Sequence, residues 1–371
     1  MFKLVTGILW LIVFVRFILP LPWPWALKAL LALVLLIASQ YHYFSRLSSG
    51  SVFSPEFPRP LVVAFNALFG AILFLALFLL AIDVVSLVVL PFIGAFPDFT
   101  ELRYAAALLA LALSAFGVSR AIIVPPLKDI EIAIPRLDAA FDGYRIVQLT
   151  DLHISRLFPA AWTAAMVERT NALESDLIVI TGDFIDGSLE HRRDDVEPLR
   201  GLRARDGILA ISGNHEYFFD AQAFLMHFEA MGMRMLSNSH AVIERGDAKL
   251  VVAGIPDRSA RRNGFDAPDL GVALRNAPGE APVILLDHQP MQARHAAAAG
   301  VALQLSGHTH GGMIRGMDRL MARPNNGFVS GLYQVGPMQL YVNNGTALWP
   351  GFALRLGRPA ELTRITLRRK G

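Results

Sequence analysis

The chain has 371 residues, of which 54% are hydrophobic and only 18% are charged, and its mean hydropathy is +0.44. This length suffices for about two domains, and the composition excludes a disordered protein and is too apolar for an ordinary soluble enzyme. The chain contains no cysteine, which excludes disulfides, thiolate metal ligands and a cysteine nucleophile. Any metal must therefore be held by oxygen atoms and imidazole.

The charged residues are divided unevenly along the chain. Residues 1–125 hold 7 Lys/Arg and 4 Asp/Glu, whereas residues 126–371 hold 27 of each kind, so the apolar first part carries the whole net charge of +3. We expect a transmembrane helical region over residues 1–125 and a soluble domain over residues 126–371. The pI of 9.3 then reflects membrane topology and not an affinity for nucleic acid.

Four stretches of the first part are apolar enough to approach the roughly 20 residues that a membrane-spanning helix needs. They are residues 4–19, 26–39, 61–82 and 104–118. Prolines and tryptophans between the first two favour a turn in the headgroup layer. A further apolar run, residues 84–96, is expected to lie along the membrane surface. A signal peptide is the alternative for the first stretch, but no small-residue cleavage site follows it.

Four spans would place both termini on the same side of the membrane. The basic residues that flank spans on that side are Lys3, Arg46, Arg59, Arg120 and Lys128. Those on the opposite side are Lys28 and Arg103. This bias predicts a multi-pass protein of the cell inner membrane with its soluble domain in the cytoplasm. Arg16 and Asp83 lie in apolar stretches, where snorkelling or helix–helix pairing is favoured over a polar transport pathway.

The second part predicts a layered α/β fold. Short apolar runs, typical of buried strands, occupy residues 144–149, 177–180, 208–211, 250–253, 283–286 and 301–305. Residues 160–173 and 220–231 are predicted as amphipathic helices, and residues 340–345 and 354–367 as closing strands. In such folds, loops at strand ends meet in one crevice that binds ligands.

Five polar clusters begin within a residue or two of these runs. They are Asp151-Leu-His153, Gly182-Asp183, Gly213-Asn214-His215-Glu216, Asp287-His288 and Gly307-His308-Thr-His310. Imidazole and carboxylate together suit divalent first-row metals such as Mn, Fe, Zn, Co or Ni. These clusters hold more potential ligands than one ion can coordinate, so two divalent ions that share a bridging ligand are expected.

The order Asp-x-His, Gly-Asp, Gly-Asn-His-Glu, His, Gly-His-x-His resembles the calcineurin-like metallophosphoesterase superfamily, over residues 144–371. With spans ahead of it, the chain is most similar to the membrane-attached bacterial branch, transmembrane proteins with a metallophosphoesterase domain. The resemblance implies a four-layered α-β-β-α sandwich. Met313 stands where that branch often has Gln.

The resemblance also implies the ligands of two metal ions, for which Mn is favoured. The ligands of the first ion are Asp151, His153 and His310. Those of the second ion are Asn214, His288 and His308. Asp183 bridges both ions, and His215 binds no metal but acts on the substrate as the catalytic residue.

Other residues near these clusters have two interpretations each. Glu216 either orients His215 or caps the following helix. Asn343 either lines the site or belongs to an Asn-Gly turn. Arg258, in a cluster with Arg261 and Arg262, either holds a second phosphate or anionic headgroup or lies in a solvated loop. Asp287 is expected to be structural.

Differences from other branches of this superfamily narrow the class of possible substrates. The run from Gly182 to Gly187 lacks the arginine of protein Ser/Thr phosphatases, and Phe184 and Ile185 offer no tyrosine ligand of the purple acid phosphatase kind. Asp186 in this run either supports the site or belongs to a turn.

We therefore expect a membrane-anchored phosphoesterase that hydrolyses phosphoester or pyrophosphate bonds with a water activated by two metal ions. The resemblance suggests lipid-linked substrates such as UDP-2,3-diacylglucosamine, from lipid A synthesis. The alternatives are a broad-specificity phosphodiesterase on soluble substrates, anchored by its spans, and a non-catalytic membrane sensor with a metal-binding domain. No Gly-rich nucleotide loop or basic–aromatic pattern indicates nucleic acid, and the sequence does not set the oligomeric state.

Overall fold

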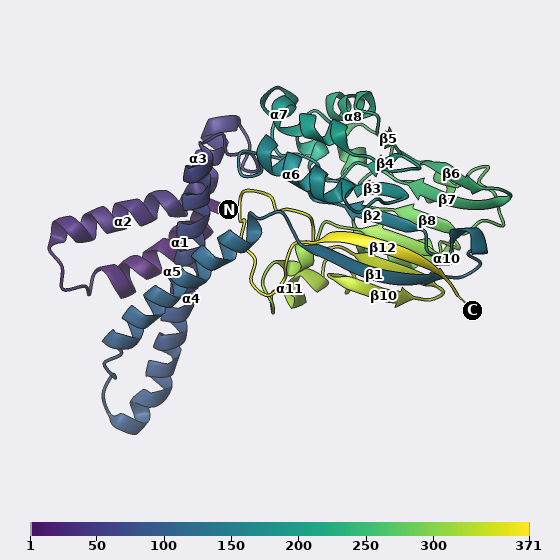
Figure 1. Ribbon diagram of the computed structural model, residues 1–371. Coiled ribbons are helices and arrows are strands. Elements are labelled where there is room, and N and C mark those ends of the chain that lie inside the picture. Colours follow the sequence, from purple (N-terminus) through teal and green to yellow (C-terminus); the bar gives the residue numbers. More distant parts are fainter. Residues whose placement is uncertain (1, 371) are drawn as a thin grey trace. The chain divides into compact units, whose positions relative to one another are not determined.

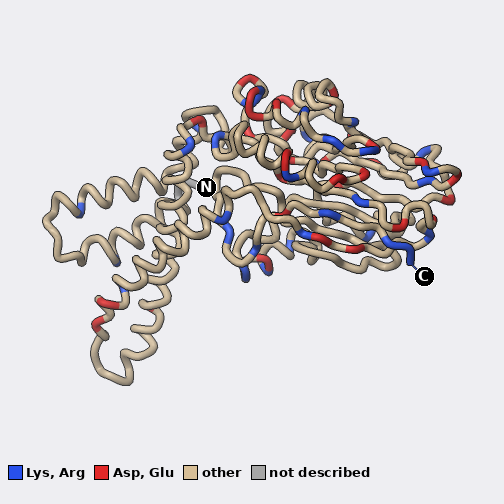
Figure 2. The backbone as a smooth tube through the Cα atoms, viewed as in Figure 1, with Lys and Arg blue, Asp and Glu red and all other residues tan. Residues whose placement is uncertain are grey.

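The computed structural model describes residues 2–370 of the chain (Figure 1). The chain divides into two compact units. The helical unit consists of Met1–Ala121 and Pro350–Leu354, and the sheet unit consists of Ile122–Trp349 and Arg355–Gly371. Acidic and basic residues are sparse in the helical unit and frequent in the sheet unit (Figure 2).

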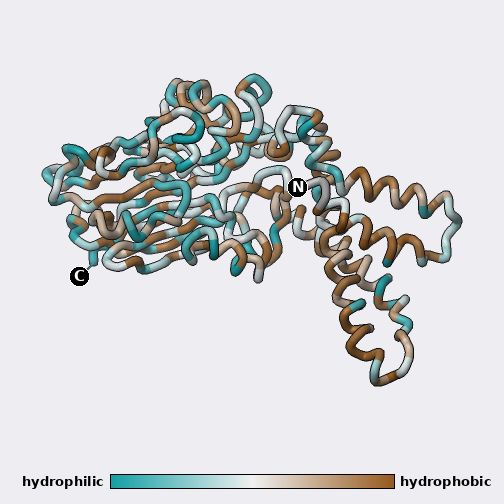
Figure 3. Tube along the Cα trace, turned by 180° about the vertical axis from the view of Figure 1, so that it is seen from behind, coloured by the Kyte–Doolittle hydropathy of each residue, from teal (hydrophilic) through white to brown (hydrophobic). Residues whose placement is uncertain are grey.

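The helical unit is built from helices, most of which are apolar and are coloured mainly as hydrophobic in Figure 3. They are α1 (Phe2–Val13) continued by the π-helical η1 (Phe14–Ile18), α2 (Trp25–Ser39), α3 (Tyr41–Ser49), α4 (Arg59–Ile93) and α5 (Thr100–Ala121). In the described chain, α4 and α5 are long and apolar enough to cross a membrane, and α2 with α3, bent by 56°, would make a third span. The first predicted stretch forms a shorter apolar helix over Val5–Ile18.

Helix α4 continues through Asp83 without a break, so the expectation of a separate surface segment over residues 84–96 is wrong. The reason is that the charge of Asp83 has partners: Arg16 Nε donates to Asp83 Oδ2 at 2.8 Å, and Arg103 Nη2 lies 4.0 Å from Asp83 Oδ1. A compensated carboxylate can remain within an apolar helix. Of the two interpretations of Arg16, snorkelling and helix–helix pairing, this contact supports pairing.

A short segment from the C-terminal part of the chain, Pro350–Leu354, belongs to the helical unit and is bound there by hydrogen bonds. Asn66 Nδ2 donates to the carbonyl oxygen of Pro350 at 2.9 Å, and Asn66 Oδ1 accepts from the backbone N–H of Ala353 at 2.7 Å. Leu354 packs so closely on α5 that a Cβ on Gly117 would lie 2.7 Å from its Cγ. The predicted strand from residue 354 accordingly begins only at Leu362.

The sheet unit contains two six-stranded sheets. The first has the order β1 (Leu127–Ile134), β12 (Leu362–Arg369), β2 (Arg145–Leu149), β3 (Leu177–Thr181), β4 (Ile208–Ile211) and β5 (Arg234–Met235). The second has the order β10 (Gly331–Val335), β11 (Met338–Val342), β9 (Leu303–Ser306), β8 (Val283–Leu286), β7 (Ala248–Gly254) and β6 (Ser239–Arg245). All six predicted central strands are present.

The two sheets pack on one apolar core, and helices cover their outer faces. Side chains that alternate along the strands, such as Ile146, Val179 and Ile211 in the first sheet and Val252 and Ile284 in the second, share this core. The first sheet is covered by α6 (Ala160–Asn171), α7 (Leu189–Val196) and α8 (Ala221–Ala230), and the second by α9 (Leu270–Ala273) and α10 (Ala293–Ala298) (Figure 1). The fold is thus the expected four-layered α-β-β-α sandwich.

The sheet topology positions the candidate site. Strands β2, β3 and β4 run parallel to one another, as do β7, β8, β9 and β11. The carboxyl ends of parallel neighbours lie at one edge of a sheet, so the loops that follow them gather there.

Candidate active site

The five polar clusters lie at the carboxyl ends of β2, β3, β4, β8 and β9 and meet in a buried centre. Two of its groups of His and Asp side chains have ligand atoms within 4.8 Å of one another. The first group is Asp151, His153 and His310. The second group is Asp183, His288 and His308. The structure therefore brings together the residues that the sequence singled out.

In the first group, nitrogen and oxygen lone pairs face one another. His153 Nδ1 lies 3.0 Å from Asp186 Oδ2, so Nδ1 carries the proton and Nε2 is left as a lone-pair donor. That Nε2 lies 3.3 Å from His310 Nε2, which lies 3.6 Å from Asp151 Oδ1. A donor set of two imidazoles and one carboxylate fits a divalent metal ion.

In the second group, the same argument holds for His288. Its Nδ1 donates to the carbonyl oxygen of Thr181 at 2.7 Å, so Nε2 faces Asp183 Oδ2 at 3.2 Å and Asn214 Oδ1 at 3.1 Å. Burial lowers the pKa of His288, but Asp183 outweighs this effect and raises the pKa well above its usual value. A site that attracts a proton this strongly also suits a metal cation. Burial lowers the pKa of His308 to about 4, which keeps its imidazole in the neutral, metal-binding form.

Asp183 lies between the two groups. Its Oδ2 is 3.2 Å from His288 Nε2 and 3.8 Å from His153 Nε2, and its Oδ1 accepts from the backbone N–H of His215 at 2.8 Å. One carboxylate thus faces an imidazole of each group. This is the geometry that a bridging ligand requires.

The backbone of the site is held in an unfavourable conformation. The residues with positive φ include five of the predicted ligands: Asp151 (52°), His153 (42°), Asp183 (56°), His308 (69°) and His310 (50°). Few residues other than glycine adopt this region, and such strain persists only where the surroundings enforce it. Gly213 allows the close approach, because a Cβ there would lie 2.2 Å from Asp183 Oδ1.

His215 is oriented by a carboxylate. Its Nδ1 lies 2.5 Å from Asp186 Oδ1, and its ring meets the ring of His153 edge-on, with centroids 4.6 Å apart. Burial lowers the pKa of His215, but Asp186 and Asp183 outweigh this effect and raise the pKa to about 9. The ring is therefore protonated at neutral pH and can donate a proton.

The structure resolves the open interpretation of Asp186 and gives Glu216 a role that we did not expect. Asp186 contacts both His153 and His215, so it supports the site. Glu216 neither orients His215 nor caps a helix; it accepts hydrogen bonds from the backbone N–H groups of Gly213, Asp183 and Phe184 at 2.6, 3.1 and 2.7 Å. The cap of α8 is Asp220.

The remaining candidates do not belong to the groups of potential ligands. Both polar atoms of the Asn343 side chain form hydrogen bonds within the sheet unit. Nδ2 donates to Thr363 Oγ1, and Oδ1 accepts from the backbone N–H of Gly345. Arg258 lines a separate cavity beside Gln289. Asp287 is buried directly before His288, and burial raises its pKa to about 7.

A residue that the sequence did not single out, Arg355, supports the loop behind His310. It is 1% exposed, and its guanidinium donates to the backbone carbonyls of His310, Asn344 and Ala347 at 3.3, 2.7 and 2.9 Å. No strand or motif precedes it, so its role is visible only in three dimensions.

The fold and the site are those of a protein whose His and Asp groups could hold a dinuclear divalent-metal centre. A family model described as calcineurin-like phosphoesterase matches residues 144–312. The chain is 32% identical, over 71% of its length and 62% of the relative, to a "transmembrane protein with metallophosphoesterase domain" of Danio rerio. It is also 32% identical, over 73% of its length and 70% of the relative, to an "uncharacterized metallophosphoesterase" of Helicobacter pylori. The chain belongs to the calcineurin-like phosphoesterase family.

The chain thus spans less than two thirds of the length of the Danio rerio relative. Among solved structures, it is similar to the NAD nucleotidase of Haemophilus influenzae, with 14% identity, a TM-score of 0.39, and coverage of 55% of this chain and 45% of that one. A TM-score of this size carries no inference about activity.

Proposed function

We propose that the protein is a membrane-anchored hydrolase of phosphoester or pyrophosphate bonds with two divalent metal ions at its active site. The observation that carries the proposal is the position of Asp183 between two buried His/Asp groups. The first ion takes Asp151, His153 and His310. The second takes Asn214, His288 and His308. When bound, two such ions activate a water molecule and neutralise charge on the phosphoryl oxygens.

His215 is the proposed general acid. Asp186 holds its Nδ1 and raises its pKa, which favours the charged form of the ring. A charged imidazole beside the ligand groups can stabilise the anionic transition state and protonate the departing oxygen. Among Mn, Fe, Zn, Co and Ni, all compatible with this donor set, we favour Mn.

The substrate that we favour is lipid-linked, with the pyrophosphate bond of UDP-2,3-diacylglucosamine as the specific candidate. The support is the helical unit, whose α4 and α5 are long and apolar enough to cross a membrane. An enzyme anchored in this way meets its lipid substrates at a high local concentration. The inner membrane is the proposed location, with the sheet unit in the cytoplasm.

The test is an assay of the purified full-length chain in detergent micelles with Mn²⁺. The panel contains p-nitrophenyl phosphate, bis(p-nitrophenyl) phosphate, nucleoside diphosphates and a nucleotide-linked lipid. We expect hydrolysis that a chelator abolishes and Mn²⁺ restores, with the lipid turned over most efficiently. Preference for a soluble diester would favour the broad-specificity alternative. Two bound ions without hydrolysis of any ester would favour the non-catalytic sensor and contradict the proposal.

A further inference from the structure

A cavity of about 480 Å³ lies in the sheet unit beside the loop that follows β7. Arg258, Arg261 and Arg262 line it together with Gln289 and Gln292. We call this cavity the arginine pocket. The arginines stand on the short helical turn η5 (Ala260–Asn263) and just before it, and all three side chains are exposed.

Three arginines and no acidic residue line the arginine pocket. Within residues 2–370, no carboxylate lies within ion-pair distance of these three guanidinium groups, although Arg258 Nη1 contacts the sulfur of Met291. The nearby Asp257 is buried and faces two neutral donors: Oδ1 accepts from the backbone N–H of Ser259 and Oδ2 from Gln289 Nε2, both at 2.7 Å. Guanidinium groups bind phosphate oxygens through paired, charge-assisted hydrogen bonds.

The same contacts connect the arginine pocket to the metal centre. Gln289 lines the pocket and directly follows the predicted ligand His288, so their Cα atoms are about 3.8 Å apart. Asp257 joins Gln289 to the turn that carries the arginines. Gln289 is thus part of the pocket wall and the chain neighbour of a predicted ligand.

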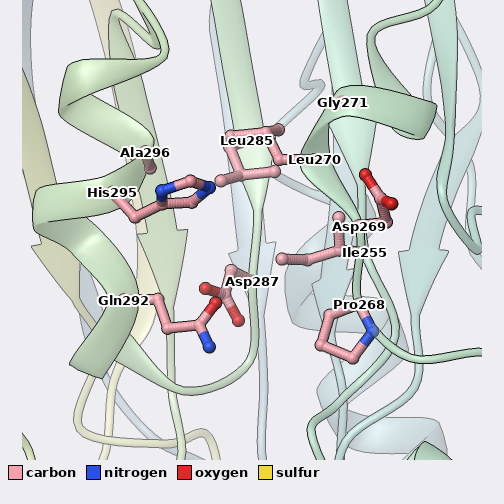
Figure 4. Close-up of a pocket in the computed structure, with 10 residues that line it drawn as sticks. All are labelled: Ile255, Pro268, Asp269, Leu270, Gly271, Leu285, Asp287, Gln292, His295 and Ala296. Carbon is pink, nitrogen blue, oxygen red and sulfur yellow. The ribbon is translucent and has the colours of Figure 1, made fainter.

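A second, smaller cavity of about 210 Å³ adjoins the arginine pocket, because Gln292 and Pro268 line both. Figure 4 shows Gln292, Pro268 and Asp287 at the same end of this smaller cavity. Asp269 and Asp287 line it and no arginine does, so an anionic group is favoured at the arginines.

We propose that the arginine pocket binds a second phosphoryl group of the substrate while the scissile group lies at the metal centre. The inference rests on the proposed function and narrows its substrate class to esters that carry a further phosphate. That phosphate can belong to a soluble nucleotide or to a lipid-linked diphosphate, since both offer the same oxygens to the guanidiniums.

The kinetic test compares the wild-type full-length protein with the Arg261→Gln/Arg262→Gln variant. The substrates are bis(p-nitrophenyl) phosphate, a nucleoside diphosphate, and a lipid-linked diphosphate in mixed micelles. Loss of charged hydrogen bonds predicts a rise in KM for the diphosphates, so their kcat/KM relative to the diester falls on the order of 10–100-fold. The soluble and lipid-linked arms show which source of phosphate the pocket serves. An unchanged ratio for both diphosphates would overturn the proposal.

Two controls separate this inference from the proposed function. The matched variant Arg203→Gln/Arg205→Gln removes the same charge from exposed positions outside the pocket and should leave the ratio unchanged. A calorimetric arm, with Mn²⁺ bound, measures the affinity of orthophosphate, pyrophosphate and tripolyphosphate. The pocket variant should lose affinity for the longer anions relative to orthophosphate even if the protein hydrolyses no ester. Equal affinities in wild type and variant would contradict the pocket whatever the activity.

Discussion

One carboxylate, that of Asp186, positions two histidines with different proposed tasks. Its Oδ2 lies 3.0 Å from Nδ1 of the predicted ligand His153, and its Oδ1 lies 2.5 Å from Nδ1 of the proposed acid His215. A carboxylate behind an imidazole fixes the tautomer and raises its basicity. The geometry of the metal centre and that of the proton donor are therefore coupled through a single residue.

We expect His215→Ala to leave the metal content unchanged and to slow turnover by about 10²–10⁴-fold, the usual contribution of general acid–base catalysis. Nitrophenolate departs readily without a proton, so activated esters should retain more activity than alkyl or sugar esters. Steady-state kinetics on both ester classes, with metal analysis, measure this effect. His191→Ala, at an exposed position, is the control. Equal slowing of both classes would rule out proton donation, and a lost ion would make His215 a ligand.

Asp186→Asn should disturb both partners at once. An amide keeps the size but loses the charge that supports both imidazoles, and changes of this kind cost about 10–100-fold in metal affinity or activity. We expect weaker binding of one ion, measured by competition with a chromophoric chelator, together with a lower kcat. The exposed Asp194→Asn is the matched control. If the variant binds both ions with wild-type affinity and turns over normally, Asp186 has only a structural role in its turn.

At the scale of elements, the site depends on loops that hold one another in place. Glu216, in the loop after β4, accepts from its own loop at Gly213 and from the loop after β3 at Asp183 and Phe184. Burial raises the pKa of this carboxyl group to about 7, and the hydrogen bonds from Gly213 and Phe184 act against that rise. The backbone on both sides of the bridging residue is thus fixed by one side chain.

Glu216→Gln should destabilise the sheet unit, because glutamine replaces one acceptor oxygen with a donor that faces backbone N–H groups. Loss of a charged, buried hydrogen bond costs about 2 kcal/mol or more, which lowers Tm by roughly 4–8 °C in a unit of this size. Thermal unfolding in detergent measures the shift. Glu229→Gln, exposed on α8, serves as the control. A variant with unchanged Tm and metal content would show that Glu216 does not hold the two loops.

The sequence predicts the clusters well because each follows a buried strand, and buried strands are visible as apolar runs. It does not reveal the task of Asp186, since its partners reach it from two other loops. The sequence likewise cannot show that helix α4 continues through Asp83. Arg16, which compensates the charge of Asp83, lies 67 residues away in the chain. The segment Pro350–Leu354 is hidden for the same reason: Asn66, which binds it, is 284 residues from Pro350.

At the scale of the whole molecule, charged residues and apolar residues are divided between two compact units. The surface of the helical unit suits lipid, and that of the sheet unit suits water. The helical unit is rich in exposed large hydrophobic side chains such as Leu108, Phe92 and Val88, with exposed fractions of 71%, 84% and 61%. Such surfaces are stable in lipid and unfavourable in water.

The orientation in the membrane is a further prediction. Five basic residues against two flank the predicted spans, which favours the cytoplasm for both termini when the span count is even. We expect a fluorescent reporter fused after Gly371 to be active and an alkaline phosphatase fusion there to be inactive. The same reporters fused between α1 and α2 give the opposite pattern in the predicted topology. Alkaline phosphatase activity after Gly371 would place the sheet unit on the other side.

The most direct test of the two-metal account is the metal content of Asp183→Asn. Because the Asp183 carboxylate faces an imidazole of each group, its loss should affect both ions, whereas other ligands serve one. Mass spectrometry of the purified proteins should find two equivalents of metal in the wild type and in the exposed control Asp247→Asn. We expect at most one equivalent in Asp183→Asn, with no hydrolysis of bis(p-nitrophenyl) phosphate. Two full equivalents in an active Asp183→Asn protein would contradict the account.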